Sequence, residues 1–325
     1  MKRLSLVVGV LIAAFFSGIA AHAERLVLNG GKGPGAGKHI VLIAGDQEYR
    51  SEESIPALAK ILSTRHGFKC TVLFSTNRQT GAIDPATMDN IPGLEALRTA
   101  DLMIEFARWL ELPDDQMKEI VDYANSGRPI IGLRTGTHPF NYKLHPESPY
   151  AKYSWNSKEL EGGFGRQIIG ETWVRHWGAH QKQSTRGVIV EGMEKHPILK
   201  GVKEVWGPSD VYEITTLTGD SKPLLMGQVL NGMTVDAAPD TTKRMMPIAW
   251  VKTYHSARVF GTTMGHAGDF QNEGFRRMVV NACYWAVGLE KKISDKSSVA
   301  IVGTYNPNEI GLNKQKKDLK VADWQ

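Results

Sequence analysis

The chain has 325 residues, a formal net charge of +5 and two cysteines, a length that supports one large domain with a substantial core or two small ones. Much of the positive charge lies near the two ends, and the body between them has no concentrated basic face, which argues against a nucleic-acid partner. Cys70 and Cys283 are predicted to be buried thiols, and a bridge between them is left open.

The first residues have the pattern of a secretory signal. Lys2 and Arg3 precede an apolar stretch over residues 4–19, and small residues end in Ala21-His22-Ala23. We expect cleavage after residue 23 and export, to the periplasm or the medium. The alternative is an uncleaved membrane anchor, because the apolar run is nearly long enough to span a bilayer. No later segment is apolar enough, so no membrane span is expected after cleavage.

The first half of the chain alternates between two patterns. Four apolar runs without a helical period predict buried strands: residues 39–44, 68–74, 101–106 and 129–133. Three intervening segments predict helices: residues 51–66, 94–98 and 113–125. Strands that alternate with helices form right-handed βαβ units. We therefore expect an α/β fold with a doubly wound, mostly parallel sheet.

The second half is less regular. Residues 143–182 are rich in aromatic residues, glycine and histidine, and predict a large insertion over the sheet. Five segments with β-branched residues predict further strands: residues 187–190, 211–214, 224–229, 247–251 and 258–263. Residues 275–287 predict an amphipathic helix. We expect one domain over residues 38–289 and an extended tail over residues 290–325, which either wraps the domain or stays mobile.

Ligands of open parallel sheets bind at the carboxyl ends of the strands, so the residues after each predicted strand are the first candidates. The long loop over residues 75–93 also belongs to this edge, and whether it closes over a pocket is left open. From the polar strand ends we expect the following side chains to bind a substrate: Tyr49, Arg50, Trp109, Arg134, Thr135 and His138.

Gly132-Leu133-Arg134-Thr135-Gly136 is the most informative of these strand ends. Glycines two residues before and two after a central residue are typical of a nucleophile elbow, where the sharp turn from strand to helix leaves no room for side chains. The central residue here is Arg134, which cannot act as a nucleophile but can hold a substrate oxygen. The alternative is a plain turn with a solvated arginine.

A second motif follows the last predicted strand. His266 lies on a glycine-flanked turn, and Asp269 could hold it in one tautomer, so we expect His266 and Asp269 to act as a catalytic pair. The alternative is that Asp269 caps the final helix. Glu48 is expected to act as a second acid or base near His266. Equally, Glu48 could pair with Arg50 at the surface.

His176 and His180 are four residues apart, with Trp173 and Trp177 beside them. On a helix that spacing could bind a metal, but Gly178 weakens a helix and no third ligand is evident. We therefore expect His176 and His180 to bind substrate, on a surface of tryptophan, tyrosine and histidine of the kind on which sugars stack. No cofactor is expected, although a divalent metal is left open.

At these residues the chain resembles the ThuA-like (trehalose-utilization) family from about residue 38 to residue 289. The resemblance rests on residues 40–52, 129–138 and 210–212, and above all on a closing block: Pro247 to Trp250, Arg258 to Phe260, Gly265-His266, Asp269-Phe270, Phe275 to Arg277, Asn281 and Trp285-Ala286. The resemblance implies a flavodoxin-like fold, that of the class I glutamine amidotransferases.

The amidotransferase template places a cysteine at the elbow and a histidine after the last strand. His266 matches the second position, but Arg134 replaces the cysteine, so glutamine hydrolysis by that route is excluded. The family's association with trehalose implies a small carbohydrate ligand. The resulting hypothesis is acid-base chemistry on a sugar or ketosugar: isomerisation, elimination or hydrolysis.

Two rival hypotheses remain. The first is a carbohydrate-binding or structural module without catalysis. The second is a metal-dependent hydrolase that uses His176, His180 and His266. The sequence also leaves open a homo-oligomer.

Overall fold

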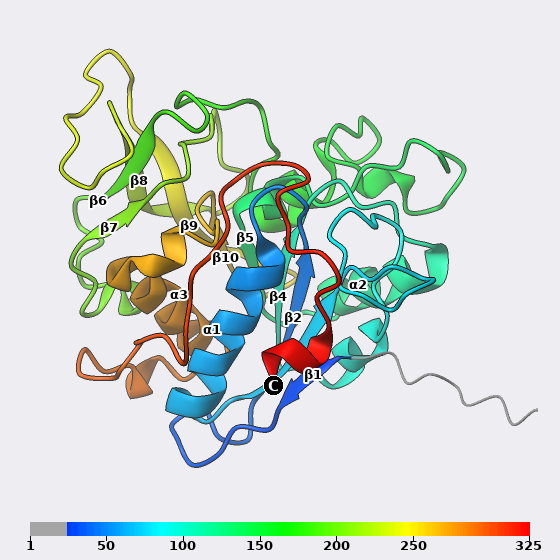
Figure 1. Ribbon diagram of the computed structural model, residues 1–325. Coiled ribbons are helices and arrows are strands. Elements are labelled where there is room, and N and C mark those ends of the chain that lie inside the picture. The colour runs from blue at the N-terminus through cyan, green and yellow to red at the C-terminus, as the bar shows by residue number, and fades with distance from the viewer. Residues whose placement is uncertain (1–24) are drawn as a thin grey trace, which may run out of the picture.

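The computed structural model describes residues 25–325, so the predicted signal segment lies outside the described residues. Within this range a ten-stranded sheet has the order β1-β3-β2-β4-β5-β10-β9-β8-β6-β7 (Figure 1). The strands are β1 (Leu26–Leu28), β2 (His39–Gly45), β3 (Lys69–Phe74), β4 (Leu102–Ala107), β5 (Ile130–Leu133), β6 (Ser184–Ile189), β7 (Val205–Gly207), β8 (Lys222–Leu230), β9 (Met246–Tyr254) and β10 (Ala257–Thr262).

The sheet is mixed. Strands β3, β2, β4, β5 and β10 are parallel neighbours in that order. Beyond β10 the strands β9, β8, β6 and β7 pair antiparallel, and β1 pairs antiparallel with β3 at the other edge. The prediction of a mostly parallel sheet therefore holds only for its central part. The antiparallel half arises because β8 and β9, and then β9 and β10, are joined without a crossover helix.

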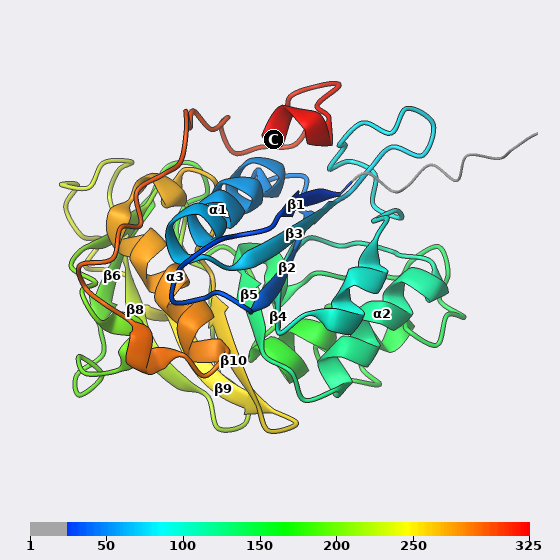
Figure 2. The ribbon, with the colours of Figure 1, turned by 90° about the horizontal axis from the view of Figure 1, so that it is seen from below.

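Helices cover both faces of the parallel part (Figure 2). Helices α1 (Ser51–His66) and α3 (Glu273–Ala286) share one apolar core with the sheet. Helix α2 (Asp114–Asn125) and the 3₁₀ helix η1 (Leu94–Thr99) share the other core. Because each strand of this part is buried on both faces, it is a nearly continuous apolar run, as residues 39–44 predict.

Several helix ends follow their sequence signals. Gly67 ends α1 in the left-handed conformation, and its backbone N–H bonds the carbonyls of Leu62 and Ser63. Asn272 begins α3, because its side chain accepts a hydrogen bond from the backbone N–H of Phe275. Asp269 therefore does not cap the final helix. It begins a separate 3₁₀ turn, η6 (Asp269–Gln271).

The predicted strands and helices of the first half agree with the structure within about two residues. In the second half, residues 211–214 were predicted as a strand but form only an isolated bridge, His176 with Tyr212. The short strands β1 and β7 were not predicted. Three-residue edge strands carry too little alternation to be recognised from the sequence alone.

Residues after α3 run back across the molecule as an ordered strap along α1 (Figure 1). Val299, Ile310 and Val321 are buried in the same core as α1. The backbone N–H of Ile83, in the loop after β3, donates to the carbonyl of Leu319. Cys70 and Cys283 are both buried free thiols. In the described part of the chain, no helix has the length and apolarity needed to cross a membrane.

Candidate functional site

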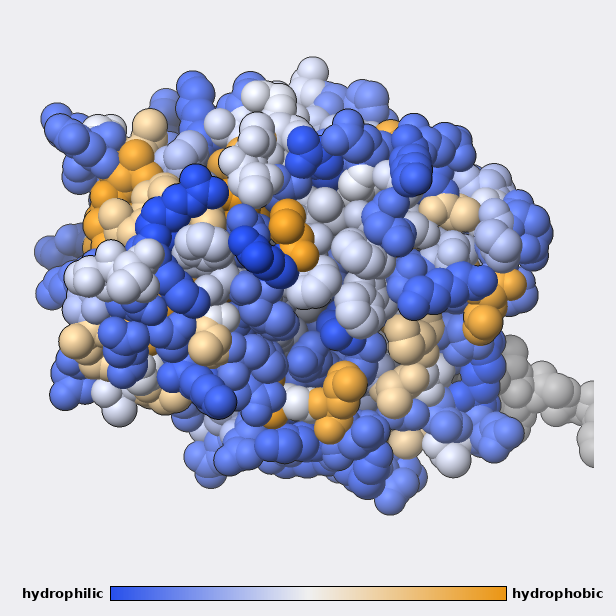
Figure 3. Space-filling view, turned by 90° about the horizontal axis from the view of Figure 1, so that it is seen from above, coloured by the Kyte–Doolittle hydropathy of each residue, from blue (hydrophilic) through white to orange (hydrophobic). Residues whose placement is uncertain are grey.

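The site lies where the parallel strands end. β2, β4, β5 and β10 run in the same direction, so the segments that follow them meet at one edge of the sheet. The inserted segments around His176 and Asp210 lie over this edge. Figure 3 looks onto this face, which is mostly hydrophilic and hollowed near its middle.

Arg134 follows β5 on a strained turn. Its φ is +46°, in the left-handed region that a non-glycine residue rarely adopts. The flanking glycines are needed for space: a Cβ at Gly132 would lie 2.9 Å from Ile169, and one at Gly136 would lie 2.6 Å from Oε2 of Glu105. The turn therefore has the sharp geometry that the glycine pattern indicates, with arginine in the central position.

The variant Gly136→Ala is expected to lower the free energy of unfolding by about 1–3 kcal/mol, because the new methyl group overpacks against the buried Glu105. Chemical denaturation measures the change. Gly31→Ala is the matched control, since a Cβ there has no neighbour within 4 Å. Equal stability of the two variants would contradict the role given to Gly136.

The guanidinium of Arg134 is fully buried between two aromatic rings. It lies 4.4 Å from the ring centre of Tyr49 and 3.7 Å from that of Tyr212. Its N–H groups donate to the backbone carbonyls of Asp210, at 2.7 Å, and Thr263, at 2.6 Å. Nη2 donates to Oδ1 of Asp210 at 2.9 Å. Arg134 therefore holds Asp210 in place, and its guanidinium, which was expected to bind a substrate, has no exposed surface in this structure.

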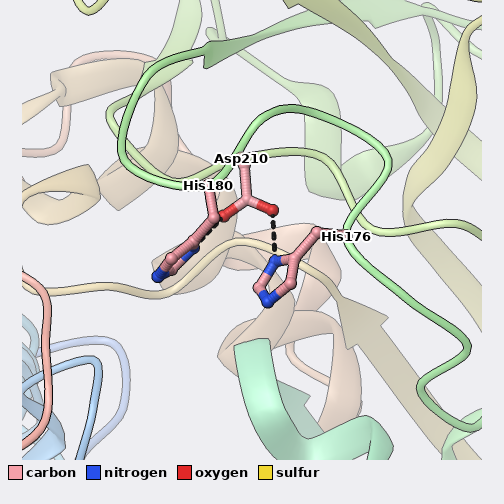
Figure 4. Close-up of side chains that lie close together, drawn as sticks. All are labelled: His176, His180 and Asp210. Atoms are coloured by element: carbon pink, nitrogen blue, oxygen red, sulfur yellow. Dashed lines mark hydrogen bonds and ion pairs between the residues drawn. The ribbon is translucent and has the colours of Figure 1, made fainter.

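Asp210 joins the two histidines of the insertion (Figure 4). Its Oδ2 lies 2.7 Å from Nδ1 of His176, and its Oδ1 lies 2.9 Å from Nδ1 of His180. The two imidazole rings are 4.4 Å apart between centres. Both histidines are partly exposed, while the carboxylate is buried. One buried carboxylate thus orients two imidazoles whose other nitrogens point away from it.

Charge is unevenly distributed within this cluster. Asp210 remains ionised: burial alone would raise its pKa, but Arg134 and hydrogen bonds from the two histidines hold it below the ordinary value. Hydrogen bonds to Asp210 and Glu48 raise the pKa of His180 to about 9. His180 is therefore an imidazolium near neutral pH. The ionised carboxylate accepts from Nδ1 of His176, which leaves Nε2 of that ring free for a substrate.

Glu48 completes the cluster on the opposite side of His180. Its Oε1 lies 3.4 Å from Nε2 of His180, and its Oε2 lies 3.1 Å from the guanidinium of Arg108. Hydrogen bonding to His180 and the charge of Arg108 lower the pKa of Glu48 although burial opposes them. The predicted surface pair of Glu48 with Arg50 is not formed. Arg50 is fully buried and pairs with Glu52 at 3.6 Å.

His266 and Asp269 are buried close together but do not form the predicted pair. Asp269 accepts hydrogen bonds from Ser209, through its hydroxyl at 2.7 Å, and from the backbone N–H of Gly265 at 2.8 Å. Nδ1 of His266 instead accepts from the backbone N–H of Gly268 at 3.0 Å. Burial lowers the pKa of His266 to about 3, so the ring is neutral. The carboxylate of Asp269 therefore does not orient the ring of His266, because it accepts hydrogen bonds from Ser209 and Gly265.

Two further predicted residues support the site from below. The hydroxyl of Thr135 donates to Oδ2 of Asp46 at 2.6 Å, and Oδ1 of Asp46 accepts from the backbone N–H of Glu48 at 2.7 Å. Thr135 is buried, and through Asp46 its hydroxyl fixes the loop that carries Glu48. His138 is also buried, and its ring lies between Trp173 and Tyr212 at 5.6 Å and 5.9 Å between centres.

An aromatic cluster adjoins the histidines. Trp109 packs against Trp155, Trp173 and His138 at 5.8–6.3 Å between ring centres. Trp173 in turn lies 5.8 Å from His176. Trp109 also forms part of the wall of a cavity of about 760 Å³. Two tryptophans of this cluster, Trp109 and Trp173, have a buried ring N–H without a partner.

His176, His180 and Asp210 also form the group in the described part of the chain that could hold a metal ion. The donor set of two imidazoles and one carboxylate suits a divalent transition metal. The surrounding charge opposes it, because Arg134 already neutralises the same carboxylate at 2.9 Å. His266, predicted as the third ligand in the metal hypothesis, is not part of this group.

The family model for ThuA, described as trehalose utilisation, matches residues 40–286. The chain belongs to the ThuA family. No protein of curated function matches it significantly.

One solved structure supports the fold, and two others show a weaker likeness. A putative ThuA-like protein from Parabacteroides merdae ATCC 43184 is 16% identical, with a TM-score of 0.51 and coverage of 77% of this chain and 90% of that one. A second, from Bacteroides uniformis ATCC 8492, is also 16% identical, with a TM-score of 0.47 and coverage of 79% and 94%. A carbohydrate deacetylase, Agd3, is 13% identical, with a TM-score of 0.39 and coverage of 78% and 32%.

Sequence reasoning assigned no role to three residues of the site: Arg108, Asp210 and Tyr212. Arg108 directly precedes Trp109 after β4, so its place at a strand end was a usable signal. Asp210 and Tyr212 do not follow a parallel strand and lie some thirty residues from the histidines that they contact. Only the path of the chain between β7 and β8 brings them to the site.

Proposed function

We propose that this member of the ThuA family binds a carbohydrate at the carboxyl edge of its parallel strands and transfers protons on it. The reaction class is isomerisation, elimination or hydrolysis of a sugar or ketosugar. The observation that carries the proposal is the shared carboxylate of Asp210, which orients two neighbouring histidines for different roles.

His176 has the role of general base. Its Nδ1–H donates to Asp210, and its Nε2 is free to accept a proton from a substrate. His180 has the role of general acid or positive anchor, because both of its nitrogens face carboxylates and the ring carries a proton near neutral pH. A base and an acid with ring centres 4.4 Å apart can remove a proton at one carbon or oxygen and deliver one to a neighbouring atom.

The aromatic cluster supports a carbohydrate as the ligand. Sugar rings offer apolar C–H faces and polar edges, and Trp109, Trp155 and Trp173 present flat apolar surfaces beside the charged cluster. Arg108 lies over the ring of Trp109, 3.8 Å from its centre, which adds a donor at the edge of this surface. Arg134 in the elbow position supplies no thiol, so the proposal excludes a glutamine amidotransferase.

The proposal includes export. The secretory pattern over residues 1–23 would place the folded domain in the periplasm or the medium, where it would meet extracytoplasmic sugars. Mass determination of the protein isolated from an extracytoplasmic fraction tests the cleavage site, and a mature chain that begins at Glu24 is the expected result.

Substitution of His176 tests the catalytic role. In a screen of trehalose, other disaccharides and their 3-keto forms, the wild-type chain is expected to convert one sugar class. His176→Gln is expected to lower turnover about 10²–10⁴-fold, the usual contribution of a general base, while sugar binding persists. His255→Asn, in the turn between β9 and β10, is the control. Binding without turnover by the wild-type chain would favour the non-catalytic module.

The metal-dependent hydrolase is a second candidate, because His176, His180 and Asp210 converge. Metal analysis of the purified protein distinguishes the metal-dependent hydrolase from proton transfer by side chains. A stoichiometric divalent ion in the wild-type chain, with loss of both the ion and turnover in His180→Gln, would favour the metal-dependent hydrolase. So would turnover that chelation abolishes in the wild-type chain and that returns when the ion is added back. Turnover that survives chelation would favour proton transfer by the side chains alone.

A further inference from the structure

A cavity of about 370 Å³ lies beside the histidine cluster, and the proposed proton transfer assigns it no role. His266 forms one wall, the strap residues from Pro307 to Ile310 form another, and Gln181 and Gln271 contribute amides. Its volume falls near the lower end of the roughly 300–1,000 Å³ typical of small-molecule sites. The cavity is therefore large enough for one small ligand.

His266 offers the cavity a hydrogen-bond donor. Its Nδ1 accepts from the backbone N–H of Gly268 at 3.0 Å, so the proton of the neutral ring is on Nε2. Nε2 is buried and makes no well-formed hydrogen bond, although the backbone of Asn308, in the strap, lies close enough to raise the pKa of the ring. The residue as a whole is 4% exposed. A buried N–H without a well-formed hydrogen bond is unfavourable, and an oxygen atom of a ligand that reaches it from the cavity would satisfy it.

The lining indicates the chemistry of that ligand. It contains the side-chain amides of Gln181, Gln271 and Asn308 and one carboxylate, that of Glu309, but no lysine or arginine. An anion would contact no cationic side chain of the lining, although Arg134 and Arg50 lie close enough behind it to act on His266. Amides and a neutral imidazole suit a ligand with hydroxyl and carbonyl groups. A hydroxyl can both donate a hydrogen bond to these side chains and accept one from them, and a carbonyl oxygen can accept one.

The strap builds this cavity onto the loop that carries Glu48. The backbone N–H of Asn308 donates to Glu53 at 2.9 Å, and that of Gly311 donates to the carbonyl of Glu48 at 2.9 Å. Arg50 donates to the carbonyl of Gly311 at 3.1 Å. The wall of the cavity is therefore fixed to the same turn that positions the acidic partner of His180.

The cavity also adjoins the reactive cluster directly. The side-chain amide of Gln181 lies 3.2 Å from Nε2 of His180. The ring of Tyr49 contacts His180 on one side and His266 on the other, at 6.0 Å and 6.3 Å between centres. A molecule in the cavity would thus lie next to the groups proposed to transfer protons.

We propose that this cavity is a subsite for one neutral sugar ring, which gives a hydroxyl or carbonyl oxygen to the Nε2–H of His266. The inference rests on the proposed carbohydrate function and adds to it the position of one ring and the role of the C-terminal strap. His266 acts as a hydrogen-bond donor to the ligand, not as a base oriented by Asp269. The ring is either a free monosaccharide or one unit of a longer sugar.

Nuclear magnetic resonance of the full mature chain with ¹⁵N-labelled histidine tests the subsite, with D-glucose and trehalose as probes. The expected spectrum without sugar shows His266 as the neutral Nε2–H tautomer. Addition of a sugar is expected to shift the Nε2–H resonance of His266. A shift with D-glucose indicates that a free ring fills the cavity, and a shift with trehalose alone indicates one unit of a longer sugar.

A cavity-blocking variant adds the control. Gln271→Trp is expected to weaken binding of the active probe at least tenfold, whereas Gln79→Trp, which adds the same side chain in the loop after β3, is expected to leave it unchanged. If Gln271→Trp does not fold, Met233→Trp blocks the same cavity.

Two outcomes would overturn the inference. If trehalose shifts His176 and His180 but neither sugar shifts His266, the subsite is wrong while the proposed function stands. If neither sugar shifts any histidine, both the subsite and the carbohydrate function fail.

Discussion

The variant Asp210→Asn is expected to lower the free energy of unfolding by about 3–5 kcal/mol, the usual cost of breaking a buried ion pair from one side. Arg134 remains fully buried and charged, but its partner becomes a neutral amide. The two histidines lose the carboxylate that orients them. Urea denaturation measures the loss of stability, and the pKa of His180 is expected to fall toward its ordinary value.

The control is Glu213→Gln, three residues along the same segment. Glu213 pairs with Arg175, whose side chain is largely exposed, so the expected loss is about 1 kcal/mol or less. If Asp210→Asn costs no more than this control, the central position of Asp210 in the cluster is wrong.

Stability is expected to fall by about 6 kcal/mol between pH 5 and pH 9, with about 4 kcal/mol from Glu52 and about 2 kcal/mol from His180 after a discount for solvent screening of its partly exposed ring. His180 and Glu52 both contribute to the decline. The folded pKa of His180 is raised to about 9, so its contribution is fully present below its ordinary pKa of 6.5 and is lost as the pH rises through 9. Burial raises the pKa of Glu52 to about 8 in the folded state. As the pH rises from 4.5 to 8, this carboxyl group therefore ionises in the unfolded state only, and the folded state loses stability relative to it.

The variant Glu52→Gln separates the two contributions. It removes the penalty of a buried carboxyl group and is expected to flatten the decline between pH 5 and pH 8, leaving the part due to His180 at higher pH. Glu191→Gln changes an exposed carboxylate and is the control. Thermal unfolding at a series of pH values measures the slopes, and an unchanged slope for Glu52→Gln would show that another group dominates.

The first half of the fold could be predicted because its signals are local. The run over residues 39–44 is apolar without a helical period, and Gly67 and Gly127 mark helix ends. The antiparallel half could not be predicted in the same way. Short β-branched segments such as residues 211–214 and 247–251 look alike in sequence, and only the pairing of distant segments decides which of them join the sheet.

The candidate site shows the same division. The glycines around Arg134 predict a sharp turn, because space around a backbone is a local property. The partner of His266 could not be read from spacing. Asp269 is three residues away, yet its carboxylate accepts a hydrogen bond from Ser209, which follows β7 and lies sixty residues earlier in the chain. His176 and His180 were recognised as a pair, but not the Asp210 that joins them.

Local signals in the chain indicate the α/β character, the sharp turn at Arg134, the arginine in place of the amidotransferase cysteine and the resemblance to the ThuA family. Each depends on a residue type or on neighbours within a few positions. The contacts of Asp210 with both histidines, the burial of Arg134 behind it and the wall that the C-terminal strap forms beside His266 become visible only in the folded chain. Burial and charge pairing between distant segments set these features, because a side chain's pKa and partners depend on what the fold places around it.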